Sequence, residues 1–213
     1  ISKDLTDLGV ENELKNIESP NEEDLIHIEM LLDAADAATE MGVKFDPWEE
    51  IRLGMVAELS GHLERAEGNF KQASRHFKRN ADREGEATSL NALGNIAITR
   101  GDLAEAERLN QESLAIAREI GYREGEADSL GNLGNIAKRR GDIAEAERLY
   151  QESLVIDRED GNREGEARLL NNLGIIAETR GDLAEAERLY QESLAFKREI
   201  DDRKGEATSL HNL

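Results

Sequence analysis

The chain has 213 residues, a formal net charge of −20 and no cysteine. Without cysteine, a disulfide framework and thiolate metal sites are excluded, and a reducing compartment such as the cytoplasm is expected. The negative charge would repel nucleic-acid phosphates and anionic membrane surfaces, so neither is expected as a partner. No apolar run approaches the roughly 18–20 residues that span a membrane, and no signal-peptide pattern opens the chain. The 38% apolar content suits an elongated stack of amphipathic helices better than a compact sphere.

The first 48 residues are the most acidic part of the chain, with 13 acidic and 3 basic side chains. Residues 22–41, EEDLIHIEMLLDAADAATEM, predict an amphipathic helix that fits the second helix of a degenerate leading repeat. Residues 1–20 are either the first helix of that repeat or a loosely docked segment, with Pro20 marking a break. Asp46 and Pro47 start the next helix, because proline is tolerated at the first helical position.

From residue 49 onward the sequence repeats with a period of 40 residues. The pair Gly-Asp stands at 101–102, 141–142 and 181–182, and each copy is followed by a nearly identical run such as LAEAERLYQESLA. The repeat units are 49–88, 89–128, 129–168 and 169–208, followed by the incomplete copy SLHNL at 209–213. Periods of 20–50 residues are typical of solenoids and propellers, and the absence of alternating β-branched strands excludes a propeller. The incomplete copy predicts that the chain is a piece of a longer protein.

Each unit is expected to form two helices. In the unit 129–168, apolar residues recur at helical spacing at 130, 133, 136 and 137, and again from 143 to 156. Gly141 suits the left-handed end of the first helix, and Asp142 can cap the second, with Glu145 completing a capping box. Gly161 is expected to end the second helix. Helix pairs of this kind cannot bury their apolar faces alone, so they stack on their neighbours.

A glycine recurs inside each first helix, at Gly54, Gly94, Gly134 and Gly174. Glycine in a helix interior costs about 1 kcal/mol relative to alanine. Its recurrence predicts a helix that approaches too closely to leave room for a side chain. The expected contacts on the second helices are the small residues Ala106, Ala146 and Ala186.

These positions carry a resemblance to a known family. Leu93-Gly94, Ala97, Gly101, Ala106 and the aromatic position of Tyr150 resemble the tetratricopeptide repeat pattern. The 40-residue form, the triplet LGN at 93–95 and 133–135, and REGEA at 123–127 and 163–167 are similar to the Leu-Gly-Asn and kinesin-light-chain subclass, in which REGEA corresponds to the inter-repeat segment. The resemblance implies an all-α, right-handed α-solenoid of stacked helix-turn-helix repeats over residues 49–213.

One unit departs from the pattern. Asn110 stands where Phe70, Tyr150 and Tyr190 stand in the other units. We interpret it as a smaller polar residue in an apolar site between helices. Replacing it with tyrosine is then expected to fill the site and to stabilise the array by about 0.5–2 kcal/mol.

The sequence contains no constellation that indicates catalysis or a cofactor. Its four histidines are scattered, and Asp24 with His27 is more typical of solvated surface than of a metal site. No phosphate-binding loop of the form GxxxxGK[ST] is present. The acids Glu105, Glu107 and Glu112 lie beside Arg108 on an outward helix face and indicate ion pairs. We therefore expect neither an enzyme nor a bound cofactor or metal.

The most plausible binding surface is the polar side of the first helices. In the family that the repeats resemble, first helices line a concave groove. Asparagine offers one acceptor and two donors, which match a peptide bond, and lysine and arginine suit ligand carboxylates. The predicted groove residues are Asn91, Asn95, Ile98, Asn132, Asn135, Lys138, Arg139, Arg168, Asn171 and Ile175.

Two functions of different classes follow. The first is a scaffold that binds a protein or peptide partner in this groove, and the basic groove residues suit a partner that carries acidic residues. The second is a self-assembling array, because repeat ends without polar caps can stack into a homo-oligomer, and Leu210 would then lie at the interface. A regulatory module within a larger signalling protein is a further alternative.

Overall fold

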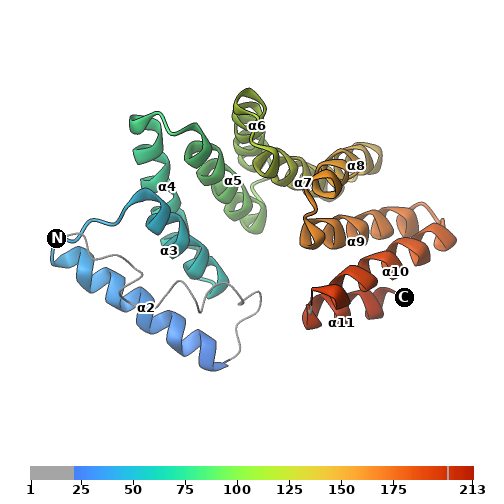
Figure 1. Cartoon of the computed structure of the whole chain (residues 1–213), viewed down its shortest axis with the longest axis horizontal. Helices are drawn as coiled ribbons and strands as arrows, with labels where there is room; N and C mark the ends of the chain where they lie inside the picture. Colours follow the sequence, from blue (N-terminus) through green and yellow to red (C-terminus); the bar gives the residue numbers. More distant parts are fainter. Residues whose placement is uncertain (1–21, 201) are drawn as a thin grey trace. The chain divides into compact units, whose positions relative to one another are not determined.

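The computed structural model describes residues 22–200 and 202–213. For Glu22, Glu23, Asp24, His27 and Lys204 only the helical backbone is described. The predicted alternatives for residues 1–20, and the side chains of the Asp24–His27 pair, therefore lie outside the described residues. Within the described part the chain is all-α (Figure 1), and helices that follow one another within either of its two compact units pack together. The chain divides into two compact units, one up to Asp102 and one from Leu103 onward.

The first unit contains α2 (Glu22–Glu40), α3 (Pro47–Leu59), α4 (Leu63–Asn80) and α5 (Arg83–Arg100). The predicted start of α3 is confirmed: Pro47 occupies its first turn, and Asp46 and Glu49 form a complete capping box. The core between these helices is made of buried apolar side chains, among them Ile28, Leu32, Ile51, Phe70 and Phe77. The Trp48 ring packs edge-on against Phe77, with 4.9 Å between the ring centroids.

The second unit contains α6 (Leu103–Ile120), α7 (Arg123–Arg140), α8 (Ile143–Asp160), α9 (Arg163–Thr179), α10 (Leu183–Glu199) and α11 (Arg203–Asn212). Its largest fully buried side chains include Leu130, Ile136, Tyr150, Leu170 and Tyr190. Buried serines connect the two helices of a pair: Ser153 on α8 donates to the Ala127 carbonyl on α7 at 2.8 Å, and Ser193 on α10 donates to that of Ala167 on α9 at 2.7 Å.

The turn residues act largely as expected. Gly141 and Gly161 end α7 and α8 with left-handed φ values of 82° and 71°. Asp142 caps α8 by accepting from the Glu145 backbone nitrogen at 3.2 Å. The expected capping box is incomplete, because the Glu145 carboxylate binds Arg148 instead.

Two expectations about the first helices need correction. The REGEA segments are the first turns of α7 and α9 and not connections between repeats, because these helices begin at Arg123 and Arg163, and Asn162 caps α9 directly ahead of its REGEA. The helical glycines face rings and not alanines: a Cβ added at Gly134 would lie 2.6 Å from Tyr150 Cε1, and Gly174 and Gly54 meet Tyr190 and Phe70. The close approach is real, and the aromatic side chain causes it.

Candidate peptide-binding face

Six of the ten predicted groove residues lie accessible on α7 and α9, and we call them the first-helix face. The buried apolar stripe of α7, which includes Leu130 and Ile136, leaves the rest of the helix free to carry polar side chains. Arg139 and Arg168 are exposed, and the other four are half-buried. The first-helix face consists of Asn135, Lys138, Arg139, Arg168, Asn171 and Ile175.

Lys138 has an environment that is unusual for a cation in this acidic protein. Its Nζ donates to the Asn172 Oδ1 at 3.2 Å and lies 5.8 Å from the centroid of the Tyr150 ring. Burial, with the neighbouring Arg139 charge as a smaller cause, lowers the pKa of Lys138. Both contacts are to uncharged groups, so a ligand carboxylate would find a partly desolvated ammonium without a competing carboxylate.

Asn135 supports the core as well as the face. Its Oδ1 accepts a hydrogen bond from the Tyr150 hydroxyl at 2.8 Å. Tyr150 is otherwise fully buried against Gly134, and burial raises the pKa of its hydroxyl. An asparagine amide group carries two donors besides this acceptor, and these are the atoms through which Asn135 could bind a peptide carbonyl.

Arg168 and Asn171 join neighbouring first helices. Arg168 on α9 pairs with Asp128 on α7 at 3.4 Å, and these residues occupy equivalent positions in successive units. Asn171 accepts from the Asn212 amide on α11 at 3.0 Å. Part of the polar face is thus engaged in contacts between repeats, which align the first helices side by side.

The remaining predicted residues fall elsewhere. Asn132 is buried and donates to the Asn110 Oδ1 at 3.1 Å, so its prediction as a groove residue is wrong. Ile98 is also buried, and its expected exposure is wrong. Asn91 and Asn95 are half-buried on α5 in the first unit.

The Asn110–Asn132 contact also overturns the interpretation of Asn110. Asn110 is fully buried and donates to the Ala106 carbonyl at 2.8 Å while accepting from Asn132. It is therefore a hydrogen-bonded polar residue and not an underfilled apolar site. A tyrosine at this position would remove the acceptor of the Asn132 amide and the hydrogen bond to the Ala106 carbonyl, and each buried hydrogen bond contributes about 0.5–1.5 kcal/mol.

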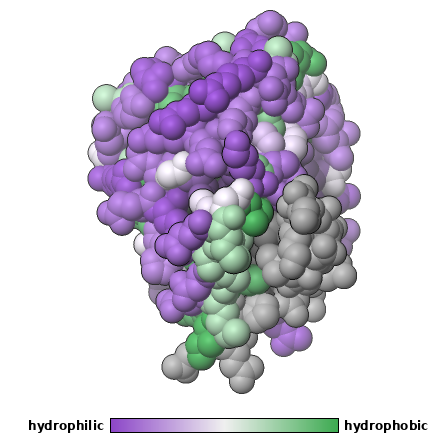
Figure 2. Space-filling model, turned by 90° about the vertical axis from the view of Figure 1, so that its left-hand side faces the viewer, coloured by the Kyte–Doolittle hydropathy of each residue, from purple (hydrophilic) through white to green (hydrophobic). Residues whose placement is uncertain are grey.

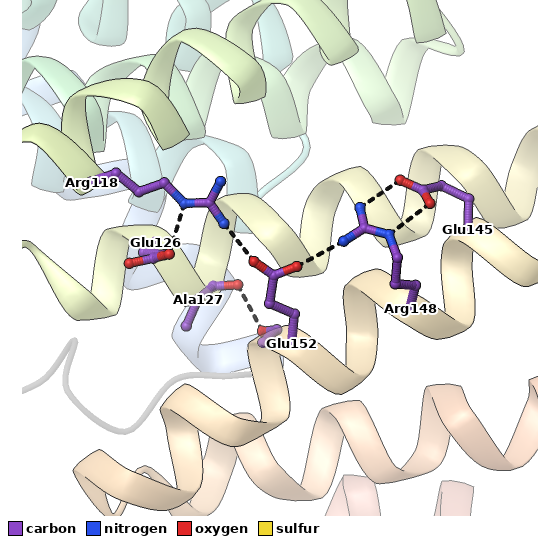
Figure 3. A network of polar contacts seen from close by, with 7 residues as sticks. Arg118, Glu126, Ala127, Glu145, Arg148 and Glu152 are labelled. Atoms are coloured by element: carbon purple, nitrogen blue, oxygen red, sulfur yellow. Dashed lines mark hydrogen bonds and ion pairs between the residues drawn. The ribbon is translucent and has the colours of Figure 1, made fainter.

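Sequence reasoning missed two equivalent clefts, one between α6, α7 and α8 and the other between α8, α9 and α10. Each has a volume of about 350 Å³ and a floor of leucine side chains. Figure 3 shows the ion-pair chain beside the first cleft, which joins Arg118 to Glu126 at 2.8 Å and to Glu152 at 2.5 Å. Arg148 extends the chain by pairing with Glu152 at 2.9 Å and with Glu145 at 2.7 Å.

These pairs had a signal in the sequence. Arginine or glutamate recurs forty positions after each of these five residues, and Glu192 forms the equivalent pairs with Arg158 and Arg188. The hydrogen bond with Arg148 is the main cause that lowers the pKa of Glu145. The expected pairing of Arg108 with Glu105 and Glu112 is confirmed. All of these arginines already bind carboxylates, which distinguishes them from Lys138.

In the part of the chain that the structure describes, no group of His, Asp or Glu side chains is arranged to hold a metal ion. Among the helices described, none combines the length and apolar character needed to cross a membrane.

The fold is built of helix-turn-helix units, and in the pairs α3–α4, α7–α8 and α9–α10 an aromatic ring packs on a glycine. The tetratricopeptide repeat model matches residues 49–119 and 125–199, which is more than half of the chain. The chain belongs to the tetratricopeptide repeat family, whose fold is generally a non-catalytic repeat scaffold.

Solved structures show the same fold at low sequence identity. A kinesin-light-chain-like protein of Podosopora anserina with nearly identical repeats has 18% identity and a TM-score of 0.60, with 78% of this chain and 82% of that one covered. The Rap conjugation gene regulator of plasmid pLS20, in complex with the Phr* peptide, has 15% identity and a TM-score of 0.76, with coverages of 87% and 51%.

A signal transduction ATPase of Pyrococcus horikoshii with a tetratricopeptide repeat sensor has 19% identity and a TM-score of 0.70. The match covers 87% of this chain and 27% of that protein, so the chain corresponds to only part of the larger one. No curated protein sequence matches the chain.

Proposed function

We propose that this repeat array is a protein-interaction module that binds an extended, acidic peptide segment along the first-helix face. The family of the chain supports an interaction role, and the Rap regulator carries a peptide on a related fold. The observation that carries the finer proposal is Lys138, a partly desolvated cation whose contacts are a neutral amide and a ring. Arg139 adds a second positive charge beside it, so an approaching carboxylate gains from both.

The side chains around Lys138 suit an extended backbone. Asn135 offers amide donors, and Ile175 offers a half-buried apolar surface on the neighbouring helix. The Arg168–Asp128 and Asn171–Asn212 contacts join successive first helices and restrict the side chains of Arg168 and Asn171. Such pre-ordered side chains lower the entropy that a ligand must lose on binding.

The experiment is to probe an array of acidic peptides with the purified protein and to measure the best binder by titration calorimetry. Lys138→Gln is expected to weaken binding roughly tenfold or more, because a charge-assisted hydrogen bond contributes about 1.5–3 kcal/mol. Lys44→Gln makes the same charge change at an exposed position in the first unit and should leave the Kd unchanged. Equal loss in both variants would show a general charge effect and contradict the proposal.

Self-assembly is the rival function, and one observation favours it. Leu210 on α11 is 51% exposed, whereas the equivalent Leu130 and Leu170 are each 1% exposed. If this face joins copies of the chain, Leu210→Glu converts an oligomer to a monomer in sedimentation. In that case Lys138→Gln leaves the oligomer intact, so the two functions are separable.

A further inference from the structure

Helix α2 carries two apolar stripes, only one of which is used by the fold. Ile28, Leu32 and Ala35 are almost fully buried in the core of the first unit. A second stripe on another side of the helix is exposed, with Ile26 at 61%, Met30 at 65% and Met41, directly after the helix, at 78%. Ala34 and Ala37 lie between them and are also exposed.

The spacing makes this second set a continuous surface. Its members follow one another at intervals of three or four residues, which places them on one side of a helix. We call Ile26, Met30, Ala34, Ala37 and Met41 the outer stripe of α2. Figure 2, which looks at the side of the molecule where α2 lies, shows hydrophobic surface running beside hydrophilic surface.

Acidic residues border the outer stripe along one edge. At 100° per residue, the acidic residues fall between the outer stripe and the buried face of α2, and they are Glu29, Asp33, Asp36 and Glu40. All four are exposed, and α2 contains no lysine or arginine. Two basic side chains of the first unit face this border: Arg65 pairs with Asp36 at 2.8 Å, and the His62 Nε2 lies 3.8 Å from the Glu29 carboxylate. The border therefore keeps a net negative charge.

We propose that the outer stripe of α2 docks a basic amphipathic helix of a protein partner. Exposed methionines fit apolar side chains of varied shape, since their unbranched chains adapt to the surface that they meet. Lysines or arginines beside the apolar face of the partner would meet the acidic border. This surface lies in the first unit, apart from the first-helix face, so the inference goes beyond the proposed function.

Charge argues against the other possible occupants. Two copies of α2 would bring acidic borders near one another, which destabilises pairing. Residues 1–20 carry five acidic and two basic side chains, so they too are poorly matched to the border. Anionic membrane surfaces would be repelled for the same reason.

The experiment uses the full chain and a model peptide of leucine and lysine that forms an amphipathic helix, measured by fluorescence anisotropy. The peptide should bind at least tenfold more tightly than a scrambled peptide of the same composition. Ile26→Gln with Met30→Gln should remove that difference. The matched control is Val155→Gln with Leu183→Gln. Both of these apolar residues are exposed and lie in the second unit, so the control should leave binding of the peptide unchanged.

Three results would overturn the proposal. Equal binding of the scrambled peptide would reduce the interaction to general electrostatics. Dimerisation in sedimentation that Ile26→Gln with Met30→Gln abolishes would identify a second copy as the occupant. A melting temperature lowered by this pair and not by the control pair would show that the chain itself covers the stripe.

Discussion

At the residue scale, Asp157 is the clearest conflict between a side chain and its site. It lies on α8 with 3% exposure, and its Oδ2 has no hydrogen-bond partner. The equivalent positions hold Phe77, Ala117 and Lys197, so the slot is not built for a carboxylate. Its Oδ1 accepts from the Asn162 amide at 2.9 Å. Burial raises the pKa of Asp157 to about 6, which exceeds the ordinary aspartate value.

The raised pKa of Asp157 makes the stability of the fold depend on pH. Because the pKa is higher in the folded state, the folded state binds the proton more tightly, and the destabilisation by this group grows as the pH rises from about 4 and is complete above about 6. The contribution of Asp157 to the free energy of unfolding should therefore rise as the pH falls from 7.5 toward 4. A shift of about two units corresponds to about 3 kcal/mol as an upper value.

Asp157→Asn tests this assignment. The variant keeps an acceptor for Asn162 and removes the charge, so it should raise the free energy of unfolding by about 2 kcal/mol at pH 7.5. Near pH 4 the variant and the parent should be nearly equal, because both are then neutral at this position. Urea denaturation followed by circular dichroism at the two pH values measures the difference. The same gain at both pH values would show that the carboxylate charge is not the cause.

At the element scale, a ring placed over a glycine locks the helix pairs α3–α4, α7–α8 and α9–α10, whereas α6 carries Asn110 at the position of the ring. Tyr150 on α8 covers Gly134 on α7, and the same arrangement recurs between Tyr190 and Gly174. The glycine costs helix propensity and permits a fully buried aromatic ring, which is worth more than the propensity lost. This explains why a helix breaker persists in the middle of successive first helices.

Two glycines of α7 provide a matched comparison. Gly134→Ala places a Cβ 2.6 Å from the Tyr150 ring and should lower the free energy of unfolding by about 1–3 kcal/mol. Gly131→Ala places a Cβ at an ordinary 3.7 Å from its nearest neighbours, so it should be neutral or stabilising by up to about 1 kcal/mol. Equal effects in chemical denaturation would mean that the ring is not the constraint.

At the scale of the whole molecule, stability should be distributed between the two units. In repeat proteins each unit contacts mainly its neighbours, so local damage need not spread through the array. Trp48 is the only tryptophan of the chain, and it packs on Phe77 in the first unit. Its fluorescence therefore reports on the first unit, whereas circular dichroism reports on all the helices.

Gly134→Leu separates the two signals. The substitution should wedge α7 from α8 and move the circular dichroism midpoint to lower urea, while the Trp48 fluorescence midpoint moves less. Parent protein measured by both methods serves as the reference. Equal shifts of both midpoints would show that the chain unfolds as one cooperative body.

The sequence by itself determined the helical class, the 40-residue period, the capping of α3 and α8, and the close contact at Gly134, because each depends on local spacing and backbone preference. Only the tertiary structure decided which residue fills each contact. Nothing local distinguishes Asn132, buried against Asn110, from Asn135, which is half-buried and bonded to Tyr150. Likewise, α2 reads as one amphipathic helix, and only packing shows which of its apolar stripes is buried. A helix offers several sides, and the choice between core and surface depends on neighbours that are distant in sequence.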